Sequence, residues 1–556
     1  MNNKYINMRF LYILILGCVF SFYSCEDALD STFDGYLAEN PDNRLDLDTE
    51  EKIRKVLVSA YPQSSYFYLT EMASDNTEEN ASTAYSPLNL GQEQAYRWQD
   101  VVGDDIDTTY DIWRKYYYAI QTACAAIEAI NKIYEEGKVT EDALKGIEAE
   151  ARLCRAYGHF ILVNLFSKSY DPKTSNTDMG IPYVLEAEKN LLVSYDRGTV
   201  ENVYKMIEED VREALPHVGK IKLSASGSDK GGIKKYHWNK EAAYAFAARF
   251  FLYYKKYDES IKYATTALGN NPASMLRNWA KDGESVSKLD IAFNRYIEPT
   301  QTANFLLTAA ESIWGRVSGP YSVGKKFAMQ KITVNEVTPE DALPIGGWLR
   351  YRCLVYSQGA IALMPKIDEY FEYLDKVAGI GWTHIVQALF TADETLLTRA
   401  EAHALSGDLV SATKDLDTFI RAFTYYNASE RHTESPEKLI EFMRLKDPND
   451  PSKKTKHDYD PRSVETGKFK KEIHLEGLTE DQKDVIQGIL LAKRALLVHE
   501  GTRWFDINRY KIEIYRRKIY DGTPVPTDKL EVDDLRRVFQ IPQQMVVAGV
   551  KANPRK

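Results

Sequence analysis

Cysteine is scarce in this chain, which has five in 556 residues. No two of them are spaced as Cys-x-x-Cys, so the sequence contains neither a zinc motif nor a redox motif of that type. Cys124 and Cys154 lie among apolar residues on helical patterns, and Cys353 stands far from both. We expect Cys124 and Cys154 to be buried free thiols rather than the two halves of a bridge.

Long apolar runs are also missing, with one exception near the N-terminus. Phe10–Phe22 has thirteen mostly apolar residues, which is too short to span a bilayer as a helix. The basic residues Lys4 and Arg9 precede it, as in a secretory signal peptide. We expect no other segment of the chain to cross a membrane.

A cysteine at the end of this stretch indicates lipoprotein processing. Cys25 follows the small residue Ser24 and precedes Glu26 and Asp27, whereas apolar residues follow the rival Cys18. The pattern predicts removal of residues 1–24 and attachment of a lipid to Cys25, which would anchor the protein to a membrane. The alternative is a plain secretory signal with an incidental cysteine.

The chain has little positive charge relative to its size. Its 71 basic and 81 acidic residues give a net charge of −10, and removal of Lys4 and Arg9 would leave 69 against 81, or −12. This balance argues against nucleic acid as a partner. Aromatic residues, in contrast, are abundant at 12 %, with 37 Tyr and 8 Trp, and such rings suit sugar binding, interfaces and helical cores alike.

Recognisable catalytic motifs are absent as well. His499-Glu500 lacks the second histidine of a zinc-protease motif, and there is neither a phosphate-binding Gly-rich loop nor a Gly-x-Ser-x-Gly elbow. The acidic run 104–107 lacks the glycine and distal glutamate of a calcium loop. We expect no enzymatic activity, no cofactor and no metal, although 81 acids leave open a carboxylate pair of the glycosidase type.

Amphipathic helices dominate what is present. Apolar residues recur at steps of three and four over 144–165, 200–215 and 243–253. Two segments, 257–267 and 409–419, repeat one spacing of small and apolar residues, and each follows an apolar helix and a short turn. This repetition is typical of tetratricopeptide-like helical hairpins, although any helical hairpin would show part of it.

Three stretches interrupt the helical pattern. Residues 62–110, 270–385 and 425–482 are rich in Gly, Pro, Ser, Asn or charged residues, and the first two also in aromatics. Long irregular segments in a helical protein are usually functional or disordered, and the aromatics argue against disorder in the first two. We therefore interpret 25–50 as a tether leading into the fold, and 51–556 as one domain with irregular ligand-binding excursions.

The C-terminal segment Glu500-Gly501-Thr502-Arg503-Trp504-Phe505-Asp506-Ile507-Asn508-Arg509 resembles the Glu-Gly-x-Arg-x-x-Asp-Leu-x-Arg motif of the SusD/RagB family of outer-membrane lipoproteins. Further matches to this family occur in order over nearly the whole chain. Earlier matches are Cys25-Glu26-Asp27, Ala73-Ser74-Asp75-Asn76, Trp113-Arg114-Lys115-Tyr116-Tyr117, Ala151-Arg152-Leu153-Cys154-Arg155-Ala156-Tyr157 and Gly180-Ile181-Pro182. The chain departs from the family at Gln540, at Arg555-Lys556 and at Ala123-Cys124.

This resemblance implies a mostly α-helical, SusD-like fold, in which four tetratricopeptide-like helix pairs form a scaffold for the excursions. It further implies a cell-surface lipoprotein of the outer membrane that binds an oligosaccharide. Such proteins deliver the ligand to a SusC-like TonB-dependent transporter and are not enzymes. Some members bind peptides instead, and that alternative stays open.

A cluster of charged residues near the C-terminus has two interpretations. Glu500, Arg503, Asp506 and Arg509 are spaced three apart, so neighbouring members share a helix face. Together with His499 they could form an acid–base site. We expect a structural ion-pair network instead, since Trp504 and Phe505 beside them favour docking into the core.

Aromatic and polar residues of the excursions are the candidates for ligand binding. A sugar ring stacks its C–H face on an indole or phenol, and its hydroxyls need polar partners at the ring edge. The simpler alternative for each ring is that it packs a loop onto the scaffold. The predicted ligand-binding residues are Asp75, Asn76, Tyr85, Tyr96, Arg97, Trp98, Trp314, Tyr321 and Trp348.

Two further functions remain possible on sequence grounds. One is a helical surface glycoside hydrolase with its carboxylates in a cleft. The other is a scaffold that binds only protein through its repeats, for which a Trp98→Ala change would leave small-ligand binding unaffected because there is none.

Overall fold

The computed structural model describes residues 47–188, 196–222, 233–338, 342–356, 361–425, 431–447 and 455–555. The predicted signal peptide, Cys25 and most of the tether lie outside these residues. Within them, none of the helices combines the length and the apolar character that crossing a membrane requires.

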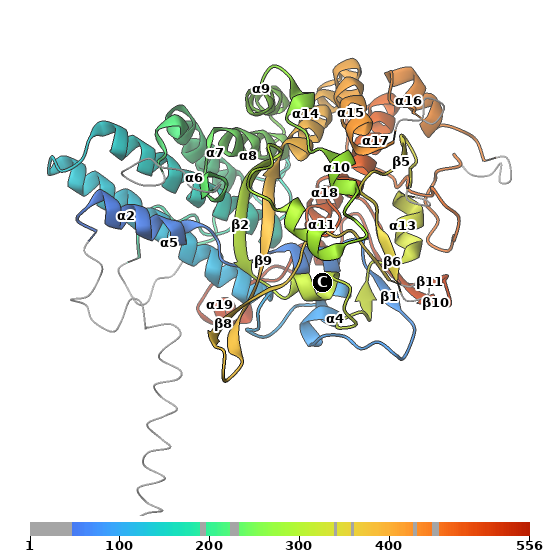
Figure 1. The fold of residues 1–556 in the computed structure, drawn as a ribbon, viewed down its shortest axis with the longest axis horizontal. Coiled ribbons are helices and arrows are strands. Elements are labelled where there is room, and N and C mark those ends of the chain that lie inside the picture. The colour runs from blue at the N-terminus through green and yellow to red at the C-terminus, as the bar shows by residue number, and fades with distance from the viewer. Residues whose placement is uncertain are drawn as a thin grey trace, which may run out of the picture.

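Long antiparallel helices form the frame of the molecule. In Figure 1 they follow one another from α6 and α7 on the left through α8 and α14 to α15 and α17 on the right. Consecutive members pack together, α5 on α6, α6 on α7, α8 on α9, α9 on α14, and α14 on both α15 and α17. The frame helices are α2 (Glu50–Leu57), α5 (Thr109–Glu135), α6 (Glu141–Phe166), α7 (Val200–Ala214), α8 (Lys240–Tyr253), α9 (Tyr257–Leu268), α14 (Ala392–Ser406), α15 (Leu409–Phe423), α16 (Pro436–Met443) and α17 (Glu480–Leu496).

Local sequence explains where these helices begin. Thr140, Thr199 and Thr391 each accept a hydrogen bond at the hydroxyl from a backbone N–H in the first turn, which satisfies one otherwise unpaired donor. Thr479 and Gln482 form a reciprocal capping box at the start of α17. The three periodic segments of the sequence are confirmed as α6, α7 and α8.

The predicted repeat is confirmed as two helical hairpins, α8–α9 and α14–α15. The small residues of the second helices are buried where the helices approach, as Ala264 and Ala412 show. Ser260 also donates its hydroxyl to the Ala248 carbonyl at 2.8 Å, which ties α9 to α8. Left-handed Gly407 ends α14 and forms the tight turn into α15.

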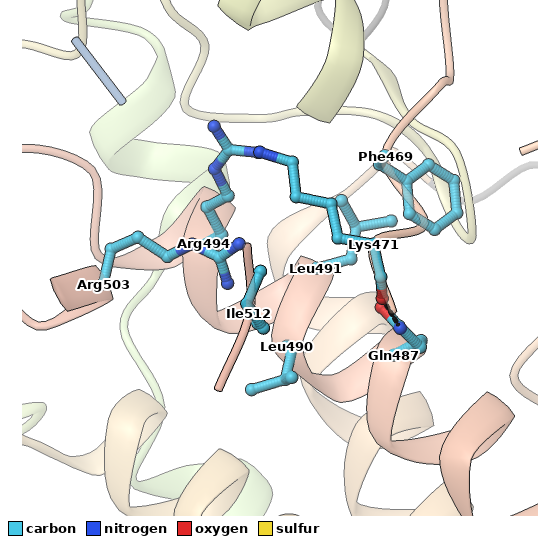
Figure 2. A pocket seen from close by; sticks show the side chains of 8 residues that line it. All are labelled: Phe469, Lys471, Gln487, Leu490, Leu491, Arg494, Arg503 and Ile512. Atoms are coloured by element: carbon cyan, nitrogen blue, oxygen red, sulfur yellow. Dashed lines mark hydrogen bonds between the residues drawn. The ribbon is translucent and has the colours of Figure 1, made fainter. Parts of the chain in front are cut away.

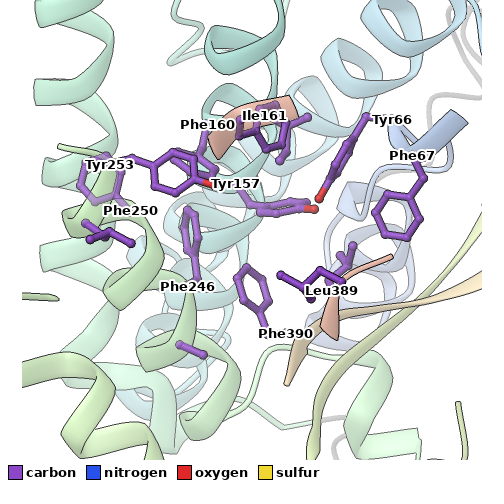
Figure 3. Close-up of a cluster of buried hydrophobic side chains, with 14 of the residues drawn as sticks. Tyr66, Phe67, Tyr157, Phe160, Ile161, Phe246, Phe250, Tyr253, Leu389 and Phe390 are labelled. Atoms are coloured by element: carbon purple, nitrogen blue, oxygen red, sulfur yellow. The ribbon is translucent and has the colours of Figure 1, made fainter. Parts of the chain in front are cut away.

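Aromatic rings fill much of the space between the helices. Figure 3 shows Tyr157 and Phe160 of α6 facing Phe246 and Phe250 of α8, with Phe390 beneath them. The centroids of Tyr157 and Phe246 are 5.7 Å apart in an edge-to-face arrangement, which suits the ring quadrupoles. A large share of the aromatic composition therefore serves the core.

The cysteines of the frame are buried free thiols, as expected. Cys154 accepts a hydrogen bond from the Trp238 indole N–H at 3.3 Å. Cys124 lies against the Arg155 guanidinium at 3.7 Å.

The excursions are more regular than the sequence indicates. Short helices occur there, namely α3 (Phe67–Ala73), α4 (Leu90–Tyr96), α10 (Trp279–Gly283), α11 (Leu289–Tyr296), α12 (Trp314–Ser318) and α13 (Lys331–Val337). The C-terminal part adds α18 (Arg503–Arg509) and α19 (Gln543–Val547). The strands are β1 (Glu78–Asn80), β2 (Asn304–Glu311), β3 (Phe327–Ala328), β4 (Ala342–Leu343), β5 (Gly347–Trp348), β6 (Leu354–Tyr356), β7 (Ile361–Leu363), β8 (Tyr370–Asp375), β9 (Ile380–Thr391), β10 (Ile514–Tyr520) and β11 (Thr523–Leu530).

Two larger sheets brace the excursions against the frame. One has the strand order β2-β9-β8, and the other β11-β10-β1-β3, so that β1 pairs in parallel with β10 from the opposite end of the chain. Figure 1 shows β2 and β9 running beneath α8 and α14, while the β8–β9 hairpin projects from the body. Most other strands have only two or three residues, which is too short to produce a visible alternation in sequence.

The segment after β5 packs closely on α10. Leu349 forms an isolated bridge with Thr424, which follows α15, and Tyr351 contacts the Trp279 ring edge-to-face at 5.5 Å. Gly283 ends α10 directly against this segment, where a Cβ atom would lie 2.0 Å from the Arg350 carbonyl oxygen. Only glycine fits at this crossing.

A Gly283→Ala change should therefore lower the free energy of unfolding by about 1 to 3 kcal/mol, because backbone must move to admit the methyl group. Urea unfolding would measure the loss. The matched control is Gly219→Ala, whose added Cβ would meet no heavy atom within 4 Å and should change stability by less than about 0.5 kcal/mol. Equal stability of the two variants would contradict the close approach.

Candidate functional site

Two of the predicted ligand-binding rings, Tyr96 and Trp98, are buried around an arginine. The Arg516 guanidinium carbon lies 4.2 Å from the Tyr96 centroid and 4.0 Å from the Trp98 centroid. The Tyr96 hydroxyl donates to the Arg517 carbonyl at 3.1 Å, and the Trp98 indole N–H donates to the Ala73 carbonyl at 2.8 Å. Their ring faces therefore pack a buried cation, as in the simpler alternative that each ring packs a loop onto the scaffold.

Asp75 and Asn76 are buried as well. The Asp75 carboxylate accepts two hydrogen bonds from Arg503, both at 2.9 Å, and one from Lys471 at 2.6 Å. Arg494 donates to the Asn76 side-chain oxygen at 2.8 Å and to the Asp75 carbonyl at 2.6 Å. Both side chains thus join the end of α3 to α17 and α18 instead of facing solvent.

Burial alone would raise the pKa of Asp75, but the positive charges of Arg494, Arg503 and Lys471 hold it well below its ordinary value of 3.8. The carboxylate is therefore ionised over the whole physiological range and has its full set of partners. An ionised, saturated group of this kind serves the fold.

Trp314 is the third ring that proves buried. Its indole N–H donates to the His499 carbonyl at 2.7 Å, and its ring contacts Tyr68 edge-to-face at 6.0 Å. It packs α12 against the C-terminal segment, in agreement with the simpler alternative for each aromatic.

Four predicted residues do reach solvent, namely Tyr85, Arg97, Tyr321 and Trp348. Arg97 pairs with Glu93 at 2.8 Å and Glu79 at 3.3 Å. Tyr321 and Trp348 are each about half exposed, at 50 % and 48 %. The nine predicted residues therefore form no single site, and a ligand-binding role for any of them remains a prediction.

The C-terminal charged cluster is confirmed as a buried ion-pair network. Asp506 pairs with Arg509 at 2.5 Å and with Lys493 at 3.3 Å, and Arg509 pairs with Glu401 at 2.7 Å. Glu500 pairs with Lys366 at 2.8 Å. All of these side chains are partnered, and all except the partly buried Arg509 are buried, so the cluster connects α14, α17 and α18.

His499 takes no part as a charged group. Burial lowers the pKa of His499 to about 3, so its imidazole is neutral near pH 7. Its Nε2 accepts a hydrogen bond from the Met364 backbone N–H at 3.2 Å.

A cavity lined by the three cationic partners of Asp75 is too small for a sugar. Its volume is about 10 Å³, which is the space of a single water molecule. Figure 2 shows that aliphatic side chains and three cationic side chains enclose it. The lining residues are Phe469, Lys471, Gln487, Leu490, Leu491, Arg494, Arg503 and Ile512.

A second hollow, of about 290 Å³, lies between α6, α7 and the turn that follows α7. Charged side chains such as Lys145, Arg152 and Glu213 line much of it, and Arg152 is paired with both Asp210 and Glu213. The His217 imidazole is the one aromatic ring in its lining. The lining therefore contains no Trp, Tyr or Phe ring on which a pyranose could stack.

The segment that begins with β5 presents a different surface. Side chains alternate along Trp348–Cys353, so that Leu349, Tyr351 and Cys353 are buried while Trp348 and Arg352 are exposed and Arg350 is partly exposed. The buried side anchors the segment on α10 and α15. The outward side therefore holds its residues on a rigid backbone.

Tyr425 completes this outward side. It lies opposite Trp348, to whose carbonyl its backbone N–H donates at 2.7 Å, so the two side chains project on the same side. Tyr425 is 54 % exposed. The Arg350 guanidinium carbon lies 4.8 Å from the Tyr425 centroid, and Arg350 Nε donates to the Thr424 carbonyl at 2.9 Å. We call Trp348, Arg350 and Tyr425 the Trp348 surface.

Sequence reasoning found Trp348 but missed its two partners. The alternation Trp-Leu-Arg-Tyr-Arg is visible in the sequence and could have placed Arg350 beside Trp348. Tyr425 is placed beside Trp348 only by the bridge between Leu349 and Thr424, and no local sequence pattern predicts that bridge.

Comparison with known proteins identifies the fold. Residues 35–252 match the SusD-like_3 family, described as "Starch-binding associating with outer membrane". A putative sugar binding protein from Bacteroides vulgatus has a TM-score of 0.62 and 16 % identity, over 90 % of this chain and 98 % of its own. A SusD superfamily protein from Bacteroides thetaiotaomicron has a TM-score of 0.58 and 16 % identity over the same shares of the two chains.

The chain therefore has a SusD-like, helical, tetratricopeptide-like fold, and its residues 35–252 resemble the SusD-like_3 family. A search of curated protein sequences produced no match.

The Asp75 cluster leads to a stability prediction. An Asp75→Asn change should lower the free energy of unfolding at pH 7 by about 3 to 5 kcal/mol, because it leaves Arg503 and Lys471 buried without their counter-charge. Because the folded-state pKa is depressed, this contribution exists above the ordinary value of 3.8 and fades as the pH falls through the folded value. The deficit should thus shrink below about pH 4.

Urea unfolding at several pH values would measure this deficit. The matched control is Asp100→Asn, since the exposed pair of Asp100 with Arg555, at 2.9 Å, should contribute less than about 1 kcal/mol. A pH-independent deficit would show that the charge of Asp75 is not what stabilises the fold.

Ionisation of Glu71 should affect stability in the opposite direction to that of Asp75, because the pKa of Glu71 is raised and that of Asp75 is lowered. Burial raises the pKa of Glu71 to about 7, although Asn76 and the Gly501 N–H donate to its carboxylate at 3.1 and 2.9 Å. A raised folded-state pKa means that stability is present below the ordinary value of 4.5 and is lost as the pH rises through about 7. The loss should amount to about 3 kcal/mol between these limits.

The Glu71→Gln variant, which cannot ionise, should lose less stability than the parent between pH 4.5 and 8. Unfolding midpoints across this range would measure the difference in slope. Exposed Glu136→Gln serves as the control and should retain the parent slope. Parallel curves for Glu71→Gln and the parent would refute the assignment.

Proposed function

We propose that this chain is a non-catalytic, oligosaccharide-binding lipoprotein of the cell surface, and that the Trp348 surface holds its ligand. The observation that carries the proposal is the pair of half-exposed rings, Trp348 and Tyr425, on the same side of two hydrogen-bonded backbone segments. A pyranose can cover such rings with its C–H face, while Arg350 donates hydrogen bonds at their edge.

The comparisons support the class of ligand. The matching family is described as starch-binding and associated with the outer membrane. Similar solved structures include a putative sugar binding protein and a SusD-like carbohydrate binding protein, both from Bacteroides vulgatus. At identities of 16 % and 13 %, these structures establish a shared fold only. We infer the class of ligand from this fold together with the exposed rings.

Membrane attachment and transport complete the proposal. A lipid on Cys25 would hold the protein at the outer membrane, and a SusC-like TonB-dependent transporter would receive the sugar from it. Release would follow from a ligand-dependent shift between two arrangements of the complex, which requires different affinities for the ligand in the two.

The residues that most resemble an acid–base site support a non-catalytic role. Glu500 and Asp506 are buried with cationic partners, and neutral His499 is enclosed beside them. Their chemistry is already used in holding α14, α17 and α18 together. A peptide ligand remains the alternative within the same fold.

Replacing either ring should remove most of the binding. Trp348→Ala and Tyr425→Ala should each weaken affinity for the cognate oligosaccharide by about ten- to a hundredfold, since covering a ring contributes on the order of 1.5 to 3 kcal/mol. Calorimetric titration of the full-length chain in detergent, with panels of neutral oligosaccharides, acidic oligosaccharides and peptides, would measure it.

Trp382→Ala is the matched control, because Trp382 on the projecting β8–β9 hairpin is exposed to the same degree, 46 %. It should bind as the parent does. Binding that survives both ring replacements, or binding of peptides alone, would overturn the proposal.

A further inference from the structure

Arg350 stands out at the Trp348 surface because it has no carboxylate partner among the described residues. Other arginines of the described residues do have such partners, as Arg399 does in Asp415 at 2.7 Å and Arg431 in Asp417 at 3.0 Å. In a chain of net charge −10, acidic side chains are plentiful. Since Arg350 has no ion pair within the part of the chain that the structure describes, its positive charge is available at the surface.

The guanidinium is held in a defined orientation. Its Nε–H donates a hydrogen bond to the Thr424 carbonyl at 2.9 Å, and its Cζ atom lies 4.8 Å from the Tyr425 ring centroid. No hydrogen bond to another described residue occupies the two terminal nitrogens. A guanidinium fixed at one edge and open at the other matches the two oxygens of a carboxylate.

A second arginine adds positive charge to the same side. Arg352 is exposed two residues after Arg350, and the alternation of the segment directs both away from the core. The outward side thus carries an aromatic ring followed by two arginines.

From this arrangement we infer that the Trp348 surface binds an acidic sugar, a pyranose carrying a carboxylate, in preference to its neutral counterpart. The carboxylate of a uronic acid is attached to the sugar ring itself. The ring can therefore stack on Trp348 and Tyr425 while the carboxylate accepts two hydrogen bonds from Arg350. The inference rests on the proposed oligosaccharide function and specifies its ligand class.

The test compares each acidic polymer with its own uncharged form. Polygalacturonate, alginate and hyaluronate would be titrated against the full-length chain in detergent, each beside its methyl-esterified form, together with neutral glucans and mannans. At least one acidic polymer should bind, and esterification should weaken its binding by about tenfold or more. Raising the salt concentration should weaken it further.

Variants of Arg350 separate charge from geometry. Arg350→Gln should reduce acidic-polymer affinity to that of the esterified form, and Arg350→Lys should restore only part of it, since lysine lacks the planar pair of donors. Arg212→Gln, which removes a partly exposed arginine on α7, is the matched control and should bind as the parent does. Thermal unfolding of each variant checks that the fold is intact.

The outcomes distinguish this inference from the proposed function. Neutral polymers that bind through Trp348, with acidic polymers no better, would overturn the acidic-sugar inference and leave oligosaccharide binding in place. Loss of acidic-polymer binding in both Trp348→Ala and Arg350→Gln supports the two together. No binding to any polymer, or binding of acidic peptides alone, would overturn both.

Discussion

The ionised carboxylate of Asp75, buried among three cations, is the constraint on which the rest of the structure depends. Arg503, Lys471 and Arg494 come from α18, from the loop before α17 and from α17 itself, and all three converge on the end of α3. A buried charge without partners is too costly to persist, so these segments must meet. Their meeting places the excursions on the helical frame.

The frame and the excursions divide the aromatic residues between them. Rings such as Tyr157 and Phe246 fill the spaces between helices, and Tyr96 and Trp98 enclose the Arg516 cation. Trp348 and Tyr425 are different because the buried residues Leu349 and Thr424, next to them in the chain, hold their backbone while their rings face outward. A binding surface on such a support loses little conformational freedom when a ligand arrives.

Local features of the fold could be predicted from the sequence, whereas long-range ones could not. The helical period locates α6 and α7, and the repeated spacing of Ala264 and Ala412 locates two hairpins, because these signals lie within one helix or one turn. The sequence around Tyr96 does not show that its ring packs against Arg516, which lies 420 residues later in the chain. Tyr425 becomes a site residue only through its bridge to the β5 segment.

The parallel pairing of β1 with β10 and the 428 residues between Asp75 and Arg503 have a consequence for biosynthesis. A ribosome adding about 5 to 20 residues per second needs roughly 20 to 90 seconds to reach Arg503 after Asp75 has been made. Throughout that interval the first strand and the first buried acid lack their partners, so the native topology cannot close. If the chain is exported as proposed, this delay would favour export, because the chain stays incompletely folded until its final segment has been synthesised.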